Sequence, residues 1–400
     1  MNDNYQNDVQ NALKYFRMLL KIVGIWPLIN GYTSLFERIV SMILMIACPT
    51  SISFVLLPSG YYCFFHVKDI TVTVQMLAPM CYCVACLAKF FYLCLRTSVL
   101  KPCVEQIEND WRSIESDEHR NLMTGKVLLA HKSTLVYMVL FYFVGMSYCT
   151  FLPLLSDPFQ ISENVTVKPL IHPGLDLFID VYASPTYELI YFMHCVYAFL
   201  SVSIEITLCS VMASLVAHSC GMLRIQITRL KSLFEEARDM GNGTENLLAA
   251  VVTGHVDALN YTRNVSKALQ EICFLQVAMT TILICANEYL CIVAWRNRDV
   301  IAIVTYVCTW ITMTFNMFVI CYGGELLVAE GEKFGDATYN IEWYNLRGKK
   351  SMDLMLLIGS SKFAPKLTAG KIFELSMNTF STVIRTSFVY LNLCQAVTEW

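Results

Sequence analysis

Residues 133–155 read Ser-Thr-Leu-Val-Tyr-Met-Val-Leu-Phe-Tyr-Phe-Val-Gly-Met-Ser-Tyr-Cys-Thr-Phe-Leu-Pro-Leu-Leu, a run of 23 residues without a charged side chain. An α-helix needs about 20 mostly apolar residues to cross a bilayer, so this run is long enough to do so. Similar runs recur along the chain and predict seven transmembrane helices, at roughly 38–59, 70–95, 133–155, 187–217, 271–294, 300–322 and 371–397. The predicted fold class is an all-α membrane protein.

The composition of the 400-residue chain agrees with a multi-pass membrane protein. Hydrophobic residues make up 56% of the chain and charged residues 15%, against about 25% charged in an average soluble domain. Mean hydropathy is +0.50. So few charges cannot cover the surface of a soluble globular protein, and a disordered chain would be far less hydrophobic. The net charge of −3 offers no basic excess, so no nucleic-acid partner is expected.

The basic residues predict how the chain is oriented. Of the 29 Lys and Arg residues, 23 lie in one alternate set of segments between the spans, and 4 lie in the other set. The positive-inside rule places the basic set in the cytosol. We therefore expect an inverted topology, with the N-terminus cytosolic and the C-terminus extracellular, unlike a rhodopsin-like receptor. In this orientation the sequon at Asn164 is extracellular and is the expected glycosylation site.

Segments outside the spans suggest further helices. Residues 9–29 include a short amphipathic run ending in Trp26-Pro27, which is expected to lie in the inner membrane interface as an anchor. Residues 97–132 and 218–270 alternate acidic and basic side chains, the latter around the break Gly241-Asn242-Gly243, and are expected to continue as cytosolic helices. These helices would either pack against other subunits or be merely solvated. Further on, a short helix near 352–358, a break at Pro365 and a new helix from about Thr368 are expected.

No motif for catalysis or metal binding is present in the sequence. Cys83 and Cys86 have CxxC spacing, but a second cysteine pair and clustered histidines are missing. The 17 cysteines are therefore expected to be packing residues. Neither GxSxG, HExxH, a P-loop nor a dinucleotide fingerprint occurs, so the sequence predicts no enzyme, no metal and no cofactor. The polar first 17 residues are not expected to act as a cleavable signal peptide.

Residues 321–393 carry short motifs in a fixed order: Cys321-Tyr322-Gly323-Gly324-Glu325, Glu330, Ala337-Thr338-Tyr339, Trp343-Tyr344, Pro365, Leu367-Thr368-Ala369-Gly370, Thr379-Phe380-Ser381 and Arg385-Thr386-Ser387. Another motif, Val23-Gly24-Ile25-Trp26-Pro27, precedes the first span. In this order, in an inverted seven-span chain of this length, the motifs resemble those of the insect odorant receptor family. The middle of the chain matches the family only in its hydropathy.

Two details place the chain within that resemblance. Residues 387–391 stand where the odorant family often carries a Ser-Tyr-Ser-Tyr-Phe-like run, and here they read Ser-Phe-Val-Tyr-Leu. The Thr-Tyr and Gln-Phe pattern of the related gustatory receptors is missing from span 7. The segment between spans 4 and 5 is 54 residues long (217–270), whereas the family's coreceptor has a much longer one. The chain thus resembles a ligand-tuning subunit.

The resemblance implies an odorant-gated, nonselective cation channel in the plasma membrane of olfactory neuron dendrites. Four subunits would surround one pore, and this subunit would assemble with coreceptor subunits and bind a small, volatile, mostly apolar odorant. The chain would then divide into a cytosolic N-terminal segment with an interfacial helix (1–37), a ligand-binding bundle of spans 1–4 (38–217), spans 5 and 6 with a cytosolic anchor region (218–370), and a pore-lining span 7 (371–400).

Span 7 holds the candidate pore residues. A stripe at i, i+3, i+4 and i+7 follows one face of a helix, and in the outer half of this span it comprises Ser387, Tyr390, Leu391 and Cys394. By match to the family's motif, Leu391 is the hydrophobic gate, where an apolar ring can stop ions by dewetting. The alternative is that Leu391 packs against span 5 or lipid. Arg385, one turn deeper, needs a partner or water.

The resemblance also implies a ligand pocket among spans 2, 3, 4 and 6 in the outer half of the membrane. In the expected orientation the candidate ligand residues are Gln75, Met76, Pro79, Met80, Cys83, Phe143, Met146, Ser147, Thr150, Phe151, Tyr187, Tyr191, His194, Cys195, Val304, Thr305 and Cys308. Such aromatic and sulfur-rich side chains suit an apolar ligand bound by shape and dispersion. For each residue, helix packing is the alternative; for His194, so are hydration and pH sensing.

Two other functions remain open at this point. A gustatory-type receptor channel would have the same architecture and could form homotetramers. A secondary transporter would show inverted internal repeats and broken helices at mid-membrane, and no such repeat is recognisable in the sequence.

Overall fold

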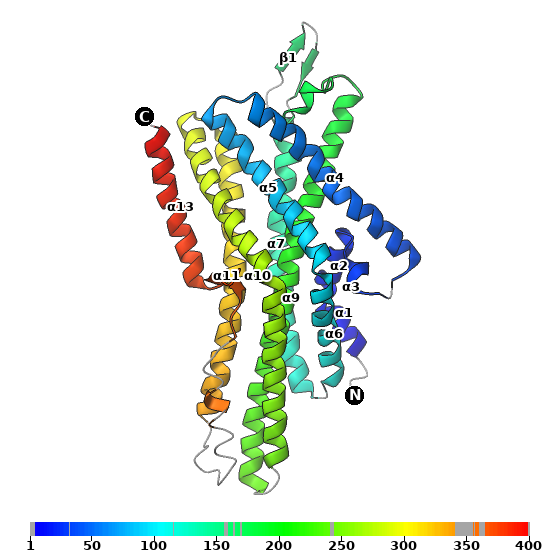
Figure 1. Ribbon diagram of the computed structural model, residues 1–400, viewed down its shortest axis with the longest axis vertical. Coiled ribbons are helices and arrows are strands. Elements are labelled where there is room, and N and C mark those ends of the chain that lie inside the picture. Colours follow the sequence, from blue (N-terminus) through cyan, green and yellow to red (C-terminus); the bar gives the residue numbers. More distant parts are fainter. Residues whose placement is uncertain are drawn as a thin grey trace.

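The computed structural model describes residues 5–31, 33–114, 116–155, 159–162, 165–168, 170–240, 244–340, 355, 357–359 and 365–398. Within these residues the protein is nearly all helical, with two small two-stranded sheets. The helices form one elongated bundle, and the C-terminus lies toward the end that carries β1 (Figure 1). The all-α fold class predicted from the sequence is confirmed.

Six helices in the described part of the chain are long and apolar enough to cross a membrane. They are α4 (Leu35–Phe65), α5 (Ile70–Leu95), α7 (Asp117–Met146), α9 (Thr186–Met240), α10 (Thr244–Arg296) and α11 (Val300–Tyr339). A further long helix, α13 (Met377–Thr398), packs beside α10 and α11. Every predicted span thus overlaps a helix, while the exact number of spans and the inverted orientation stay predictions.

Polar residues directly before the apolar runs begin three of these helices. The Ser34 hydroxyl accepts a hydrogen bond from the backbone amide of Glu37 at 3.2 Å, before α4. Asp69 accepts one from the backbone amide two residues later, at 2.6 Å, before α5. Asp299 does the same for Ala302 at 3.0 Å, before α11. Each cap satisfies an amide that has no partner within its helix, and so fixes where that helix begins.

Helix α9 is the centre of the bundle. In its most apolar stretch 83% of the residues are buried, against 22–50% in the other five apolar helices. It packs against α7, α10, α11 and α4, and against the N-terminal helix α2 (Lys14–Ile22). The other long helices therefore keep large apolar faces on the outside, which is the arrangement expected where lipid surrounds the bundle.

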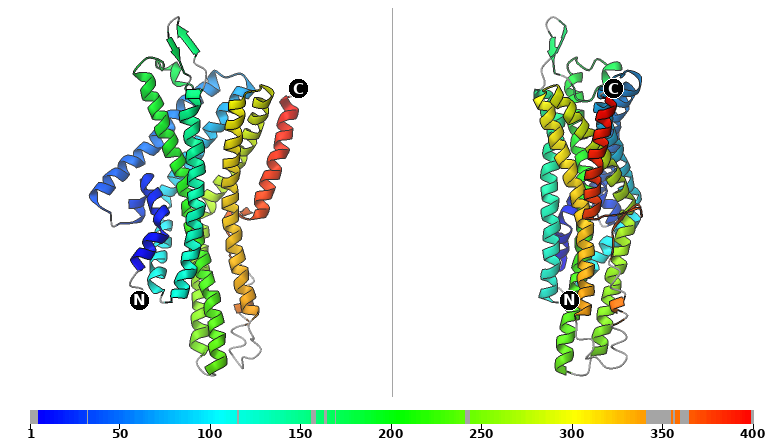
Figure 2. Two further views of the ribbon diagram at one scale, coloured as in Figure 1. Left: turned by 180° about the vertical axis from the view of Figure 1, so that it is seen from behind. Right: turned by 90° about the vertical axis from the view of Figure 1, so that its left-hand side faces the viewer.

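Helices α9 and α10 extend well beyond the rest of the bundle at the end opposite β1 (Figures 1 and 2). They contain 55 and 53 residues, which at 1.5 Å per residue is roughly 80 Å, more than twice the thickness of a bilayer's hydrocarbon core. The prediction that helix continues on both sides of Gly241–Gly243 is confirmed. The break itself lies outside the described residues.

Short helices lie together along one side of the lower half of the bundle (Figures 1 and 2). They are α1 (Tyr5–Ala12), α2, α3 (Trp26–Ile29) and α6 (Thr97–Ser113). The apolar side chains of the N-terminal segment are buried within the protein, with Phe16 and Leu20 at 0% exposure and Trp26 at 2%. This segment therefore anchors to the bundle itself, through α6 and α9.

The start of the last helix differs from the sequence prediction. We expected a helix from about Thr368 and a span from residue 371, but β3 (Thr368–Ala369) and β4 (Phe373–Glu374) form a hairpin there, and α13 begins at Met377. Gly370 and Lys371 both have a positive φ, of 59° and 60°, which turns the chain back and is incompatible with a right-handed helix. The expected short helix near 352–358 lies largely outside the described residues.

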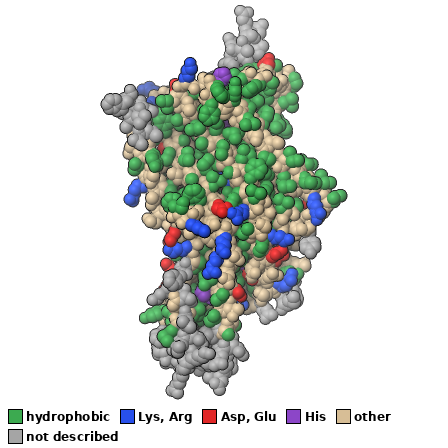
Figure 3. Space-filling view, in the orientation of Figure 1, with side chains coloured by type: hydrophobic (Ala, Val, Ile, Leu, Met, Phe, Trp, Pro, Cys, Tyr) green, Lys and Arg blue, Asp and Glu red, His purple; other side chains and the backbone are tan. Residues whose placement is uncertain are grey.

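The end of the bundle near the C-terminus carries a second hairpin, formed by β1 (Phe159–Ser162) and β2 (Val165–Val167). Asn164, the expected glycosylation site, lies outside the described residues. Figure 3 shows a broad band of hydrophobic side chains over the upper part of the molecule, with the charged side chains gathered mostly below it. An apolar band bounded by charges fits a protein that sits across a membrane.

Candidate ligand cavity and its link to the last helix

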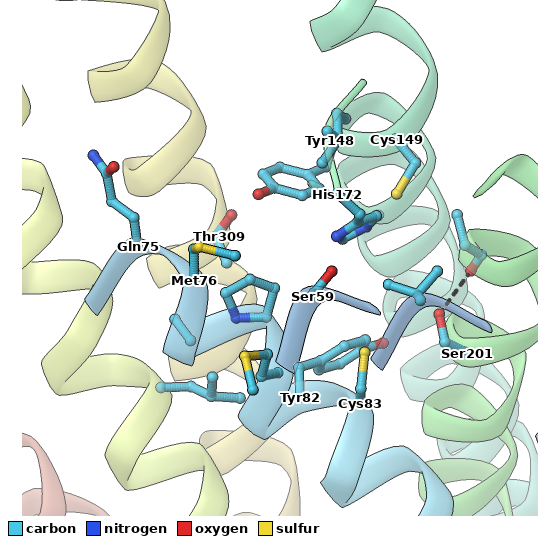
Figure 4. A pocket seen from close by; sticks show the side chains of 18 of the residues that line it. Ser59, Gln75, Met76, Tyr82, Cys83, Tyr148, Cys149, His172, Ser201 and Thr309 are labelled. Carbon is cyan, nitrogen blue, oxygen red and sulfur yellow. Dashed lines mark hydrogen bonds between the residues drawn. The ribbon is translucent and has the colours of Figure 1, made fainter. Parts of the chain in front are cut away.

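A cavity of about 530 Å³ lies between α4, α5, α7, α9, α10 and α11, in the half of the bundle nearer β1. Its volume falls within the range of small-molecule binding sites. Aromatic and sulfur-containing side chains make up much of its wall, including Met76, Tyr82, Cys83 and Tyr148 (Figure 4). Tyr197 also lines it. The loop residues Ile171, His172 and Pro173 complete the wall. The cavity can therefore enclose a small, mostly apolar molecule.

Several helices depart from regular geometry around this cavity. Pro58 lies inside α4 and Pro79 inside α5, and a proline within a helix removes one backbone hydrogen bond and bends the axis. Helix α7 ends in a π-helical turn, η1 (Ser147–Phe151), before the short α8 (Leu152–Leu155). That turn carries Tyr148 and Cys149 to the cavity wall. Such irregularities keep neighbouring helices from closing the space by regular packing.

A glycine lets α7 and α9 meet closely beside the cavity. A Cβ atom at Gly145 would lie 2.4 Å from Cγ2 of Val202, and both residues line the cavity. Nearby, the hydroxyls of Tyr142 and Ser203 are 2.8 Å apart. The α7–α9 wall is thus fixed by close packing, so the shape of the cavity on this side is well defined.

Most polar groups of the wall are already hydrogen-bonded within the protein. The Tyr197 hydroxyl lies 3.0 Å from the Cys83 sulfur. The Ser201 hydroxyl donates to the Ala198 carbonyl at 3.2 Å, a bond drawn in Figure 4. Asn287 and Thr309 bond to carbonyls one turn earlier on their own helices. Among the described residues no cluster of His, Cys, Asp or Glu could hold a metal ion.

A buried ion pair lies beneath the cavity. The Lys89 ammonium on α5 contacts the Glu205 carboxylate on α9, and the two side chains are only 2% and 4% exposed. Lys89 lies less than two helical turns from Cys83, and Glu205 one turn from Ser201. The pair therefore joins α5 to α9 directly below the cavity floor.

One hydrogen-bond cluster connects the cavity to α13. Asn287 of α10 lines the cavity, and its neighbour Glu288 faces away from it. Oε1 of Glu288 accepts hydrogen bonds from the Ser387 hydroxyl on α13 at 2.9 Å and from the Trp310 indole on α11 at 3.0 Å. Two consecutive residues of α10 thus touch the cavity and the last helix.

Comparison with known proteins identifies the family to which this chain belongs. Residues 69–388 match the family described as 7tm Odorant receptor. That match covers most of the chain. The chain belongs to the odorant receptor family. The family is one of receptors and not of enzymes.

Relatives and solved structures agree with this assignment. The chain is 21% identical to odorant receptor 10 of Aedes albopictus over 55% of its own length and 20% identical to odorant receptor Or2 of Anopheles gambiae over 59%. These alignments span 58% and 65% of the relatives, less than two thirds in both cases. The fold matches the insect olfactory receptor OR5 from Machilis hrabei, determined in complex with eugenol, with a TM-score of 0.76, 14% identity, and coverage of 99% and 100% of the two chains.

In this odorant receptor, the candidate ligand residues on α5 lie together on the cavity wall. Gln75, Met76, Met80 and Cys83 all line it, as does Pro79. Figure 4 shows Gln75, Met76 and Cys83 along one side of α5. Whether they touch a ligand stays a prediction, but they border the same space.

The other candidates lie beside or behind the cavity, and none is among the residues that line it. Tyr191 donates to the Thr150 carbonyl at 2.9 Å and stacks on Tyr187, so these three pack together nearer the end of the bundle. Val304 is 57% exposed on the outside of α11. The remaining candidates outside the wall are Phe143, Met146, Ser147, His194, Cys195, Thr305 and Cys308, and the Phe151 side chain is not described.

Sequence reasoning missed three parts of the wall, on α4, on α10 and in the loop before α9. Val55, Leu56, Ser59 and Tyr62 of α4 line the cavity, as do Leu283, Asn287 and Leu290 of α10. Pro58, the second of two prolines inside the first span, was a usable signal, because a proline bends a helix and this one precedes Ser59. The loop residues Ile171–Pro173 lie between spans 3 and 4 and belong to neither, and no sequence pattern connects them to the cavity.

The candidate pore residues lie within α13 at one-face spacing but differ in exposure. Ser387 is fully buried against α10, Leu391 is partly buried on the same side, and Tyr390 is 51% exposed. The Cys394 side chain is not described. The exposed face carries the polar residues Asn378, Thr382, Arg385 and Asn392 at helical spacing, with the apolar Val389 among them.

Proposed function

We propose that this receptor is the odorant-binding, tuning subunit of a ligand-gated, nonselective cation channel. The observation that carries the proposal is the largely apolar cavity whose α10 wall is bonded to α13 through Glu288. A ligand that shifts α10 would move the Glu288 carboxylate and with it the bond to Ser387. The olfactory receptor OR5 of Machilis hrabei, which has the same fold, was determined in complex with eugenol.

The pore would form where α13 helices of several subunits meet. Support comes from the exposed polar stripe of α13, since a helix bundle that carries ions needs polar groups or water along its passage. Arg385 makes no ion pair among the described residues and is exposed on this stripe. One such Arg per channel, contributed by a single tuning subunit, would be compatible with cation passage. Leu391 as a gate is the competing assignment.

The partners in this proposal are coreceptor subunits, a small volatile odorant, the lipid bilayer and permeating cations. The 54-residue segment between spans 4 and 5 (217–270) supports the tuning role, because the coreceptor is expected to carry a much longer one. The receptor would lie in the plasma membrane with its N-terminus in the cytosol, as the 23-to-4 distribution of basic residues indicates.

The function is tested by co-expressing the chain with the coreceptor and recording odour-evoked current. Thr309 lines the cavity, while Ile311, two residues later on α11, is 48% exposed on the outside. Thr309→Trp fills part of the cavity and should abolish or strongly weaken the response, and Ile311→Trp should leave it unchanged. Absence of any evoked current with a broad panel, despite normal surface expression, would contradict the proposed function. Robust current without a coreceptor would favour a gustatory-type homomer.

The pore assignment has its own test, based on substituted cysteines. A thiol reagent applied during activation should block current through Thr382→Cys channels and spare Ser387→Cys channels, since Ser387 is buried against Glu288. Block of Leu391→Cys but not Thr382→Cys would restore the gate assignment made from the family motif.

A further inference from the structure

The loop between η1 and α9 is fastened to α4 at the edge of the cavity. The Ser59 hydroxyl donates to the Pro173 carbonyl at 3.0 Å. Gly174 follows with a φ of 111°, and a Cβ atom there would lie 2.3 Å from the Pro58 carbonyl oxygen. Only a glycine allows so close an approach in this backbone conformation. The hydrogen bond and the close packing of Gly174 together fix the position of the nearby residue His172.

His172 is held at the cavity wall by aromatic neighbours. Its side chain is 6% exposed and lies edge-on to Tyr197 and to His194, with ring centroids 5.4 Å and 5.2 Å apart. Figure 4 shows its ring between Tyr148 and Ser59. His172 belongs to the residues that line the cavity, whereas His194 lies behind it.

The imidazole of His172 makes no hydrogen bond within the described part of the chain, and its Nε2 atom is buried without a partner. This sets it apart from Ser59, Tyr197, Ser201 and Asn287, whose polar groups are bonded inside the protein. A buried polar group without a partner costs free energy that a bonded one does not. A ligand that supplied the missing bond would recover that free energy.

The charge state of His172 narrows the ligand chemistry. Burial, together with the nearby His194, lowers the pKa of His172 to about 3, so the ring is neutral at physiological pH. A neutral imidazole offers one N–H donor and one nitrogen acceptor, and can serve either a hydroxyl or a carbonyl oxygen. The described lining residues include Asp299 and neither Lys nor Arg. An anionic ligand would therefore find no counter-charge in the wall.

We propose that His172 is the polar subsite of the cavity and that the receptor selects neutral molecules with an apolar body and one oxygen group, such as alcohols, ketones or esters. The oxygen bonds to the imidazole, and the body fills the space lined by Met76, Met80 and Tyr148. This inference rests on the proposed function of the cavity. It predicts that an alkane of equal size binds more weakly because the imidazole then stays unbonded.

The experiment compares ligand pairs rather than single ligands. Medium-chain alcohols, ketones and methyl esters are each paired with the alkane of the same number of heavy atoms. Binding is measured by thermal stabilisation of the purified full chain, and current is recorded from the same variants with the coreceptor. His172→Phe keeps the aromatic packing and removes both nitrogens, while His172→Gln keeps a donor and an acceptor on a side chain of similar reach.

In the wild type the oxygenated member of at least one pair should bind about tenfold more tightly than its alkane, the effect of one recovered hydrogen bond. His172→Phe should reduce that preference to within about twofold, and His172→Gln should restore most of it. Retained binding of the alkane by His172→Phe shows that the variant is folded and the cavity intact. An unchanged preference in His172→Phe would overturn the inference.

His194→Phe provides the comparison within the same cluster, since it removes an equally buried imidazole that does not line the cavity. A preference lost in His194→Phe and kept in His172→Phe would also overturn the inference. The two readouts separate it from the proposed function. If the preference for oxygenated ligands depends on His172 in binding but no current is evoked, the channel function is refuted and the subsite is supported. If current is evoked and its preference for oxygenated ligands is the same in His172→Phe, the subsite is refuted and the channel function is supported.

Discussion

The buried pair Lys89–Glu205 gives the sharpest prediction about what holds this bundle together. Both side chains are almost completely buried, at 2% and 4% exposure, so neither charge can be solvated when the other is removed. The second oxygen of Glu205 already lacks a hydrogen-bond partner. Lys89→Met should therefore leave an uncompensated carboxylate in the core and lower the free energy of unfolding by about 3–5 kcal/mol.

Replacing both partners should cost far less than replacing one. In Lys89→Met with Glu205→Met no charge remains buried, and such apolar replacements are close to neutral or stabilising. The coupling energy between the two positions should thus exceed about 2 kcal/mol. The exposed pair Arg96–Glu271 provides the control, because its side chains are 37% and 49% exposed and Glu271→Gln should cost about 1 kcal/mol or less.

Denaturation of the purified receptor in lipid nanodiscs measures these differences for the wild type, the two single variants and the double variant. The reasoning fails if Lys89→Met is as stable as the wild type, which would mean that water or another group solvates Glu205. It also fails if the double variant is no more stable than the worse single variant, since the loss would then come from packing and not from charge.

Three further predictions concern the loop, the lower bundle and pH. Gly174→Ala should lower stability by about 1–3 kcal/mol in thermal melts, because its Cβ would meet the Pro58 carbonyl in a backbone conformation that disfavours alanine. Glu330→Gln should destabilise more than Lys126→Gln, since Glu330 is 2% exposed and holds Lys126 at 2.7 Å while a second lysine lies within 3.2 Å; equal losses would contradict this. The pKa of His172 is lowered to about 3 in the folded protein, against about 6.5 in the unfolded chain. Below about pH 6.5 the unfolded chain therefore binds more protons at this residue than the folded one. The free energy of unfolding is at its full value above about pH 6.5 and falls by about 2 kcal/mol by pH 5. A melt series from pH 7.5 to pH 5 should therefore be flatter for His172→Phe than for the wild type.

Hydropathy predicted the long helices because side chains in contact with lipid must be apolar. A segment in contact with lipid must be apolar for about 20 residues, and each expected span overlaps a helix. The same signal ends where the membrane ends, so the predicted span 187–217 covers little more than half of α9, Thr186–Met240. The hairpin before α13 was missed because its turn depends on two positive φ angles at Gly370 and Lys371, and only the glycine is typical of that conformation.

The cavity wall was harder to predict because lipid removes the usual signal for an inner face. In a soluble bundle the buried side of a helix is the apolar one, but here the outward side is equally apolar. Val304 and Thr309 lie on the same helix and are both plausible pocket residues by type, yet the first is 57% exposed and the second lines the cavity. The rotation of each helix is fixed by tertiary packing, such as the contact of Gly145 with Val202.

Charged residues inside the spans were visible in the sequence, but their partners were not. Glu205 interrupts span 4 and its partner Lys89 is 116 positions away, so only the packing of α5 on α9 brings them together. Arg385 is different, because it lies on the exposed face of α13 and no ion pair satisfies it within the described residues. One intramembrane charge thus stabilises the subunit, while the other points toward a neighbour or water outside it.

The strength of the Glu288–Ser387 bond fits a role in transmitting ligand binding. A ligand shifts a conformational equilibrium only by its difference in affinity for the two states, and coupling energies in proteins are typically about 1–3 kcal/mol. A hydrogen bond to a carboxylate contributes about 1.5–3 kcal/mol, so making or breaking this one bond covers that range. Because Asn287 faces the cavity and Glu288 bonds to α13, a rotation of α10 relative to α13 would change the 2.9 Å separation of Glu288 and Ser387. Two neighbouring residues of α10 thus give the proposed coupling between the cavity and the pore helix a direct route, without a longer chain of contacts.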